Sequence, residues 1–164
     1  MRMGKNMDQG LVLFVETVPS IQQEFVLELH NFLSEKNCKC EIKSAKSGYV
    51  VSYINNDTKR TLANFVTRKS GIKIRMYLEH IMEYEEFLSN LPVSMKKDIV
   101  KASVCKRLIN PDDCNPKCVQ GYTFHIDGES YQKCRYMAFM PTLSAENYSF
   151  ILNLLEEELS RIIT

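Results

Sequence analysis

Four cysteines gather in the second half of this 164-residue chain. They are Cys105, Cys114, Cys118 and Cys134, and the chain has two others, Cys38 and Cys40. A tetrahedral metal site uses such a set of soft thiolates, two from a tight turn and two from flanking segments. Residues 110–118 are rich in turn-forming Asn, Pro and Asp, so a bound metal would supply the free energy that orders them. The sequence therefore predicts a four-cysteine zinc site.

The spacing of these cysteines leaves alternatives open. The pattern C-x8-C-x3-C-x15-C lacks the C-x2-C knuckles of common zinc fingers. The thiols could instead be buried as small apolar groups, or they could hold an iron–sulfur cluster. Four thiolates leave a metal no open position, so the expected zinc is structural. His125 could replace one ligand, although strand alternation favours an exposed or core-edge position for it.

A thiol-dependent enzyme is a competing interpretation. Basic residues adjoin two of the cysteines: Lys106 and Arg107 follow Cys105, and Arg135 follows Cys134. Neighbouring cations favour the thiolate form, which serves a nucleophile and a metal ligand equally. The chain has no Gly-rich phosphate loop, nucleophile elbow or H-E-x-x-H motif. We therefore expect a non-enzymatic binding module, with an enzyme that uses Cys105 or Cys134 as an alternative.

Basic residues are concentrated in the first half of the chain. From Lys39 to Arg75 there are nine basic and two acidic residues, a net +7, whereas the whole chain carries +1. A second alternative function is therefore binding of nucleic acid or an anionic ligand through a basic sheet face. Its candidate residues are Lys59, Arg60, Arg68, Lys73 and Arg75. Solvated strand positions and core aromatics would explain the same pattern.

Short alternating segments predict the strands that position these residues. An antiparallel meander is expected over 39–43, 49–54, 61–68 and 72–78. A hairpin is expected from 121–126 and 130–140 around the turn signal Asp127-Gly128. The apolar run Leu11–Val15 predicts one further short strand.

Helical spacing predicts helices over 20–37, 84–90, 94–102 and from Ser144 to the end. Ser20 and Gln23 are spaced as a capping box. Glu156–Glu158 is expected on the solvent face of the last helix. The predicted fold class is α+β, in a single domain over 1–164. Its antiparallel sheet consists of a meander plus a C-terminal hairpin. N-terminal and C-terminal helices and two short central helices are expected to pack with this sheet. Residues 1–10 are expected to form a loose extension.

Composition and the missing targeting signals indicate the cellular compartment that we expect. The chain is 45% hydrophobic and 25% charged, and its length allows a core without covalent cross-links. No apolar run approaches the ~20 residues of a membrane span, and the start lacks a signal-peptide pattern. We expect a cytoplasmic protein, where reduced cysteine clusters are more often metal sites than disulfides. The oligomeric state is not predicted.

Three segments carry a resemblance to known proteins. GYVVSYINNDTKRTLANFVTRKSGIKIRMY, KASVCKRLINPDDCNPKCVQGYTFHIDGESYQKCRY and the closing helix resemble a family of small bacterial proteins without an established activity. The strand order also resembles the YjbR-type double-wing proteins. The second resemblance implies binding of nucleic acid or small ligands, and the first implies no activity, since fold alone does not define one.

Overall fold

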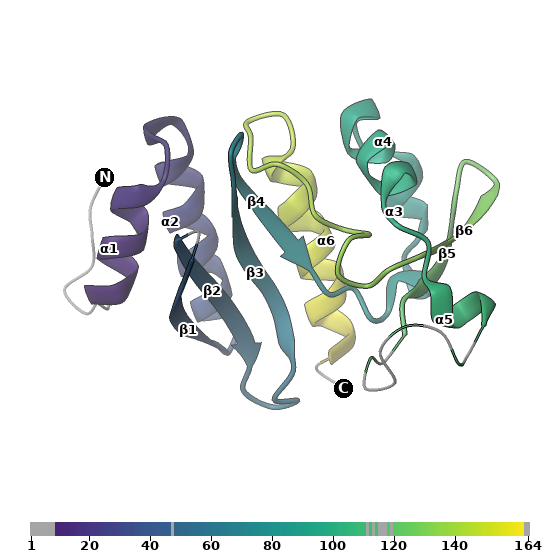
Figure 1. Ribbon diagram of the computed structural model, residues 1–164, viewed down its shortest axis with the longest axis horizontal. Helices are drawn as coiled ribbons and strands as arrows, with labels where there is room; N and C mark the ends of the chain where they lie inside the picture. Colours follow the sequence, from purple (N-terminus) through teal and green to yellow (C-terminus); the bar gives the residue numbers. More distant parts are fainter. Residues whose placement is uncertain are drawn as a thin grey trace. The chain divides into compact units, whose positions relative to one another are not determined.

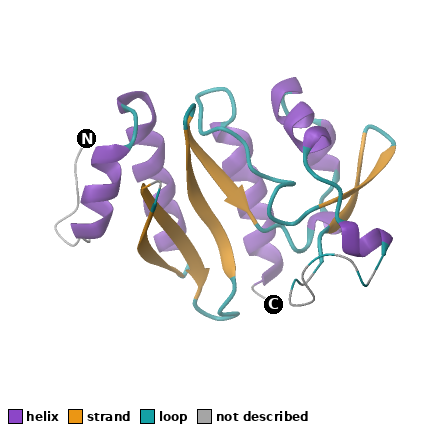
Figure 2. Cartoon of the chain, in the orientation of Figure 1, coloured by secondary structure: helices purple, strands orange, loops and turns teal. Residues whose placement is uncertain are grey.

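The structure is a computed structural model that describes residues 9–46, 48–110, 112, 114, 118 and 120–162. Its helices and two antiparallel sheets confirm the α+β class (Figure 2). Contacts within the chain separate two compact units, Met1–Ile74 with Thr142–Tyr148 and Arg75–Pro141 with Ser149–Thr164. A single domain over 1–164 stays a prediction. Residues 1–8 of the expected loose extension lie outside the described residues.

The first unit is built on a meander with the strand order β1-β2-β3-β4. The strands are β1 (Cys38–Ala45), β2 (Gly48–Asn55), β3 (Thr61–Arg68) and β4 (Gly71–Met76). β1 pairs with β2 from Cys38 opposite Asn55 to Ala45 opposite Gly48. On β4 the apolar side chains at alternate positions are buried and Lys73 between them is half-buried, as a pleated strand requires. The predicted meander is confirmed.

Two helices pack on this sheet. α2 (Ser20–Glu35) contacts β1, and α1 (Gln9–Thr17) contacts both α2 and β2 (Figure 1). The predicted strand at Leu11–Val15 is wrong, because these residues form α1. Leu11, Phe14 and Val15 are buried at helical spacing, and a short apolar run cannot distinguish a strand from a helix.

The start of α2 also differs from the expectation. Pro19 occupies the N-cap position and no side chain caps the helix, so the predicted capping box is wrong. Gln23 instead donates to the carbonyls of Val15 and Val18 and closes the turn between the two helices. Ile21, which the apolar spacing placed toward the core, is 81% exposed.

A buried glutamine on α2 holds the free edge of β4. The Nε2 of Gln22 donates to the carbonyls of Ile72 at 3.0 Å and Leu143 at 2.8 Å. Its Oε1 accepts from the Ile72 amide at 2.9 Å. Lys73 bridges to Thr142 beside these bonds. One side chain therefore bonds the amide and carbonyl of Ile72 on β4 and the carbonyl of Leu143, and the Ile72 carbonyl also accepts from the Leu143 amide at 3.0 Å.

The second unit contains the short helices and the hairpin. The elements are η1 (Ile81–Glu83), α3 (Glu86–Ser89), α4 (Val93–Lys101), α5 (Lys106–Ile109), β5 (Tyr122–Ile126), β6 (Glu129–Lys133) and most of α6 (Tyr148–Ile162). The two central helices and the hairpin are confirmed. β6 ends at Lys133 rather than Met140, because the amides of Met137 and Ala138 turn back to the Cys134 carbonyl. No helix in the described chain is long and apolar enough to cross a membrane.

The last helix buries one of its glutamates. The Oγ of Ser144 accepts from the Asn147 amide just before α6 begins. Ile151, Leu155 and Leu159 form the buried face together with Glu158, which is only 1% exposed. The prediction that Glu156–Glu158 faces solvent is wrong for Glu158. This residue lies two helical turns after Ile151 and so falls on the same face.

We expect Gln22→Ala to lower the free energy of unfolding by roughly 2–4 kcal/mol, because it leaves buried backbone groups without partners. Chemical denaturation measures this change. Glu24→Ala, at an exposed position of the same helix, is the control and should change stability by less than about 0.5 kcal/mol. Equal effects of the two substitutions would contradict the role of Gln22.

Candidate functional site

All four predicted ligands line one pocket of about 340 Å³ in the second unit. Cys105 is buried, Cys118 and Cys134 are half-buried and Cys114 is exposed. Cys38 and Cys40 lie on β1, in the first unit. Folding thus brings together residues that are up to 29 positions apart and leaves the other two thiols elsewhere.

Backbone pairing fixes two of the four cysteines. Val104 and Lys133 form an antiparallel bridge. Beside it the Cys105 amide donates to the Gln132 carbonyl at 3.0 Å, and the Cys134 amide donates to the Ser103 carbonyl at 2.7 Å. Cys105 is therefore opposite Gln132 and diagonal to Cys134, on the same face. Diagonal neighbours of this kind lie roughly 7–8 Å apart, within reach of one shared ligand.

The side chain of Lys133 holds this pairing against α4. Lys133 is buried, and its Nζ donates to the carbonyls of Val100 at 2.7 Å and Ala102 at 3.0 Å. These carbonyls end α4, where the last turn has no intrahelical donors. A lysine at a helix C-terminus also interacts favourably with the helix dipole. The segment that carries Cys134 is thereby fixed to the end of α4.

Gly121 closes the pocket beside Cys105. Its amide donates to the Cys105 Sγ at 3.2 Å. A Cβ at this position would lie 2.1 Å from the Lys133 carbonyl oxygen and 2.8 Å from the Cys105 Cβ. Only glycine fits here. The sulfur of Cys105 therefore receives a backbone hydrogen bond, the kind of contact that tunes metal-bound thiolates.

The other two cysteines belong to the loop after α5. Cys114 has a positive φ of 67°, and the Cys118 carbonyl accepts a hydrogen bond from Nη1 of Arg107. Residues 111, 113, 115–117 and 119 of this loop lie outside the described residues. Arg107, on α5, therefore contacts the loop at Cys118.

The pocket is wider than one metal ion. Among the described residues, no three His, Cys, Asp or Glu side chains form a group that could hold a metal as they stand. A four-thiolate zinc needs every sulfur at ~2.3 Å from the ion. A volume of about 340 Å³ is instead enough for many waters. Metal binding would therefore require the four sulfurs to come closer together than they stand.

The wall of the pocket is positively charged. Lys106, Arg107 and Arg135 line it, and none of its described lining residues is acidic. Arg135 also pairs with Glu79 and donates to the Gln120 carbonyl at 3.1 Å. Burial by itself lowers the pKa of Arg135, but Tyr122 and Glu79 outweigh this effect and raise the pKa. The guanidinium stays charged.

A thiol enzyme would need a base in reach of its cysteine. His125 is exposed, as expected, and its Nδ1 lies 3.3 Å from Glu85 Oε2. No histidine is among the described residues that line the cysteine pocket. Arg135, which follows Cys134 in the chain, is already paired with Glu79.

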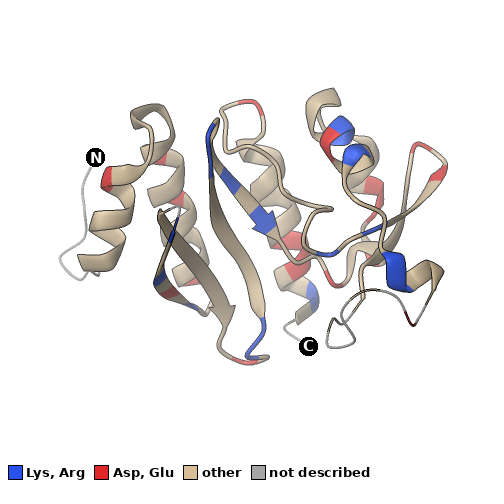
Figure 3. Cartoon of the chain, viewed as in Figure 1, with Lys and Arg blue, Asp and Glu red and all other residues tan. Residues whose placement is uncertain are grey.

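The predicted basic face is distributed over several elements (Figure 3). Lys59 and Arg60 precede β3, and Arg68 ends it, about 25 Å along an eight-residue strand. Lys73 lies on β4. Arg75 belongs to the second unit, where its Nε donates to the Tyr136 carbonyl at 2.7 Å. Binding of an anion by these five residues stays a prediction.

The aromatic residues between these cations belong to the core. Tyr53 and Phe65 are buried, with ring centroids 5.7 Å apart, and Tyr77 is 9% exposed. The Tyr53 hydroxyl lies 2.8 Å from His30 Nδ1. Burial raises the pKa of Tyr53, so the hydroxyl stays protonated. Tyr53, Phe65 and Tyr77 therefore belong to the core, as the core interpretation expects, whereas Tyr49 is half-buried.

Glu158 forms a second polar cluster, which the sequence did not predict. Its carboxylate accepts from the His80 amide at 3.0 Å, from His80 Nδ1 at 2.6 Å and from the Tyr84 hydroxyl at 2.7 Å. Burial, followed by the charge of Glu158, raises the pKa of Tyr84. The guanidinium of Arg161 lies 4.7 Å from the Tyr84 ring. The helical spacing from Ile151 was the signal that could have identified this glutamate.

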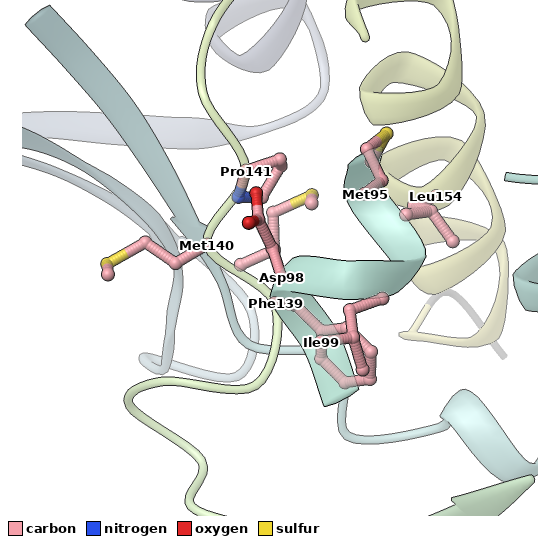
Figure 4. A pocket seen from close by; sticks show the side chains of 8 residues that line it. Met95, Asp98, Ile99, Phe139, Met140, Pro141 and Leu154 are labelled. Atoms are coloured by element: carbon pink, nitrogen blue, oxygen red, sulfur yellow. The ribbon is translucent and has the colours of Figure 1, made fainter. Parts of the chain in front are cut away.

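Two further hollows occur in the second unit. One, between Met95, Ile99 and Leu154, has about 10 Å³ (Figure 4), room for a single water. The other is an open cleft of about 240 Å³ that shares Gly121 and Arg135 with the cysteine pocket. Of these three hollows in the described part of the second unit, the cysteine pocket and this cleft have room for a ligand.

We expect Gly121→Ala to disrupt the cysteine pocket, because its Cβ would collide with backbone. Thermal unfolding should show a loss of more than about 3 kcal/mol. Gly128→Ala is the control, since its Cβ meets no atom within 4 Å and only its φ of +86° is unfavourable. It should cost about 1–2 kcal/mol. A smaller loss for Gly121→Ala than for the control would refute the close packing.

We expect Glu158→Ala to lower the free energy of unfolding by roughly 3–5 kcal/mol, because it leaves the buried Tyr84 hydroxyl and the part-buried His80 amide without an acceptor. Urea denaturation measures the effect. The exposed neighbour Glu156 supplies the control substitution Glu156→Ala, which should be nearly neutral. A neutral Glu158→Ala would mean that these hydrogen bonds contribute nothing to stability.

No family model, curated protein or solved structure matches the chain. The resemblances to the small bacterial family and to the double-wing proteins stay predictions, and the function is inferred from the site itself.

Proposed function

We propose that the protein is a non-enzymatic binding module in which Cys105, Cys114, Cys118 and Cys134 together hold one structural zinc ion. The supporting observation is that all four thiols line one pocket. Thiolate sulfur is a preferred ligand of zinc, and a closed set of four leaves no position for substrate or water. The zinc would fix the loop rather than perform chemistry.

The two halves of the site differ in what holds them. Cys105 and Cys134 are placed by backbone hydrogen bonds on either side of the Val104–Lys133 bridge. Cys114 and Cys118 are placed by the loop, whose composition offers few apolar contacts. The first pair is the preformed half, and the second pair would close on the metal.

The neighbouring cleft gives the module a place for a ligand. Glu79, Gln120, Tyr122 and Arg135 are among the residues that line it. The Tyr122 hydroxyl is buried and has no hydrogen-bond partner among the described residues. Gly121 and Arg135 line both the cysteine pocket and this cleft. In the chain, Gly121 follows Gln120 and Arg135 follows Cys134. A metal that orders these segments would therefore also shape the wall of the cleft for a small polar ligand.

Metal analysis tests the zinc proposal. Protein purified without added zinc should contain close to one zinc per chain, and Cys→Ser substitution at any of the four positions should lower this content severalfold. Cys38→Ser is the matched control, because Cys38 lies on β1, and it should keep full zinc content. Protein without zinc that also fails to bind added zinc or cobalt would refute the proposal.

Alkylation separates the zinc site from the thiol enzyme. In native protein all four cysteines should be protected from a mild thiol reagent until a chelator removes the metal. Fast and selective labelling of Cys105 or Cys134 alone in the metal-loaded protein would instead favour a nucleophilic thiol.

A further inference from the structure

We propose that the open cleft between η1 and the start of β5 binds a small α-amino acid with an apolar side chain. The carboxylate of the ligand accepts from Arg135 and from the Tyr122 hydroxyl, and its ammonium group donates to Glu79. This inference rests on the proposed binding module, whose ligand it names, but it needs neither the zinc ion nor any movement of the loop after α5. The residues that carry it all belong to the second unit.

The Tyr122 hydroxyl is a donor without an acceptor. Tyr122 begins β5, lines the cleft and is only 6% exposed. Its hydroxyl is buried and has no hydrogen-bond partner among the described residues. Burial, followed by the charge of Glu79, raises the pKa of Tyr122, so the hydroxyl keeps its proton. An unpaired buried donor is unfavourable, and a ligand oxygen in the cleft would supply the missing acceptor.

Arg135 is a second donor that lines the same cleft, and several contacts hold it in place. Its Nη1 donates to the Gln120 carbonyl at 3.1 Å, and its Nη2 pairs with Glu79. The centre of the guanidinium lies 5.5 Å from the ring of Tyr77 and 5.6 Å from the ring of Tyr122. These cation–π contacts remain when the ion pair opens. The guanidinium is therefore fixed beside the Tyr122 side chain, where both can donate to one carboxylate.

The charges of the cleft favour a zwitterion. Among the described residues that line it, Glu79 and Arg135 carry opposite charges that cancel. A simple anion bound to Arg135 would be repelled by Glu79, and a simple cation bound to Glu79 would be repelled by Arg135. A zwitterion exchanges partners with the ion pair instead. Its carboxylate meets the guanidinium and its ammonium group meets the Glu79 carboxylate, so no charge is left unpaired.

The size and the apolar part of the cleft limit the ligand further. Its volume of about 240 Å³ lies below the ~300–1,000 Å³ of sites for drug-sized molecules, so the ligand is small. Ile81 and Met82 also line the cleft, and Met82 is 57% exposed. Methionine is flexible and packs against apolar groups of varied shape. An α-amino acid such as leucine has both charged groups on one carbon and a short apolar side chain for Met82 to cover.

Calorimetric titration of the full chain with L-leucine tests the inference. Two matched ligands each lack one charged group of leucine: 4-methylpentanoate has no ammonium group, and 3-methylbutylamine has no carboxylate. L-leucine should bind saturably, and each matched ligand should bind about 10–100-fold more weakly, because the hydrogen bonds of one charged group are lost. Glycine, which has no side chain to contact Met82, should also bind more weakly than L-leucine.

Two substitutions separate binding from stability. Tyr122→Phe keeps the ring beside Arg135 and removes a hydroxyl that has no partner, so it should weaken L-leucine binding about 10-fold without lowering the unfolding temperature. Glu79→Gln should weaken L-leucine binding and strengthen 4-methylpentanoate binding, because the repelling charge is gone. Tyr131→Phe and Glu129→Gln are the matched controls on β6, outside the described lining of the cleft, and should bind L-leucine as wild type does.

The inference is overturned if L-leucine does not bind, or if it binds no more tightly than 4-methylpentanoate. It is also overturned if Tyr122→Phe binds L-leucine as wild type does, or if this variant loses stability, since the hydroxyl would then already be paired. Circular dichroism shows whether each variant is folded, and Tyr122→Phe decides the matter if Glu79→Gln is not.

Zinc content measured on the same protein separates this inference from the zinc site. Protein that contains zinc but binds no L-leucine would overturn the amino-acid site alone. Protein that binds L-leucine but neither contains nor takes up zinc would overturn the zinc site alone.

Discussion

The bridge between Val104 and Lys133 is the constraint on which the candidate site depends. It sets Cys105 and Cys134 on one face of two paired segments, while the Lys133 side chain fixes this pairing to the end of α4. The Lys133 carbonyl is also the atom that excludes any Cβ at residue 121. One residue therefore positions a helix end, two thiols and the glycine that donates to a sulfur. Loss of this bridge would separate the preformed half of the site.

Buried polar side chains have a similar role elsewhere in the chain. Gln22 satisfies the edge of β4 in the first unit, and Glu158 joins α6 to the segment around His80 in the second. In each case one side chain supplies hydrogen bonds to groups of another segment that would otherwise need backbone or water partners. Such groups contribute to stability only when every partner is present, since an unsatisfied buried polar group is costly. Because hydrogen bonds are directional, these side chains specify which segments pack together more strictly than apolar contacts do.

The cations of the cysteine pocket have different surroundings from the cations of the basic strands. On the strands, cations alternate with core side chains and are distributed along exposed edges, where water screens them. In the pocket, the half-buried Arg107 lies next to thiols in a partly enclosed space, whereas Lys106 is exposed. Charges act more strongly there because the local dielectric is lower. This contrast is the reason that we assign function to the pocket rather than to the larger number of cations in the first unit.

The meander, the hairpin turn at Asp127-Gly128 and the α+β class could be predicted from the sequence, because strand alternation and turn chemistry are local properties. The sequence also identified the four cysteines, though not the pocket that they line. Tertiary structure alone decided that Leu11–Val15 is helical and that Glu158 is buried, since both depend on which surface the segment packs against. It likewise decided which groups reach the cysteines: the Gly121 amide donates to the Cys105 sulfur and Arg107 donates to the Cys118 carbonyl, and no spacing in the chain reveals these contacts.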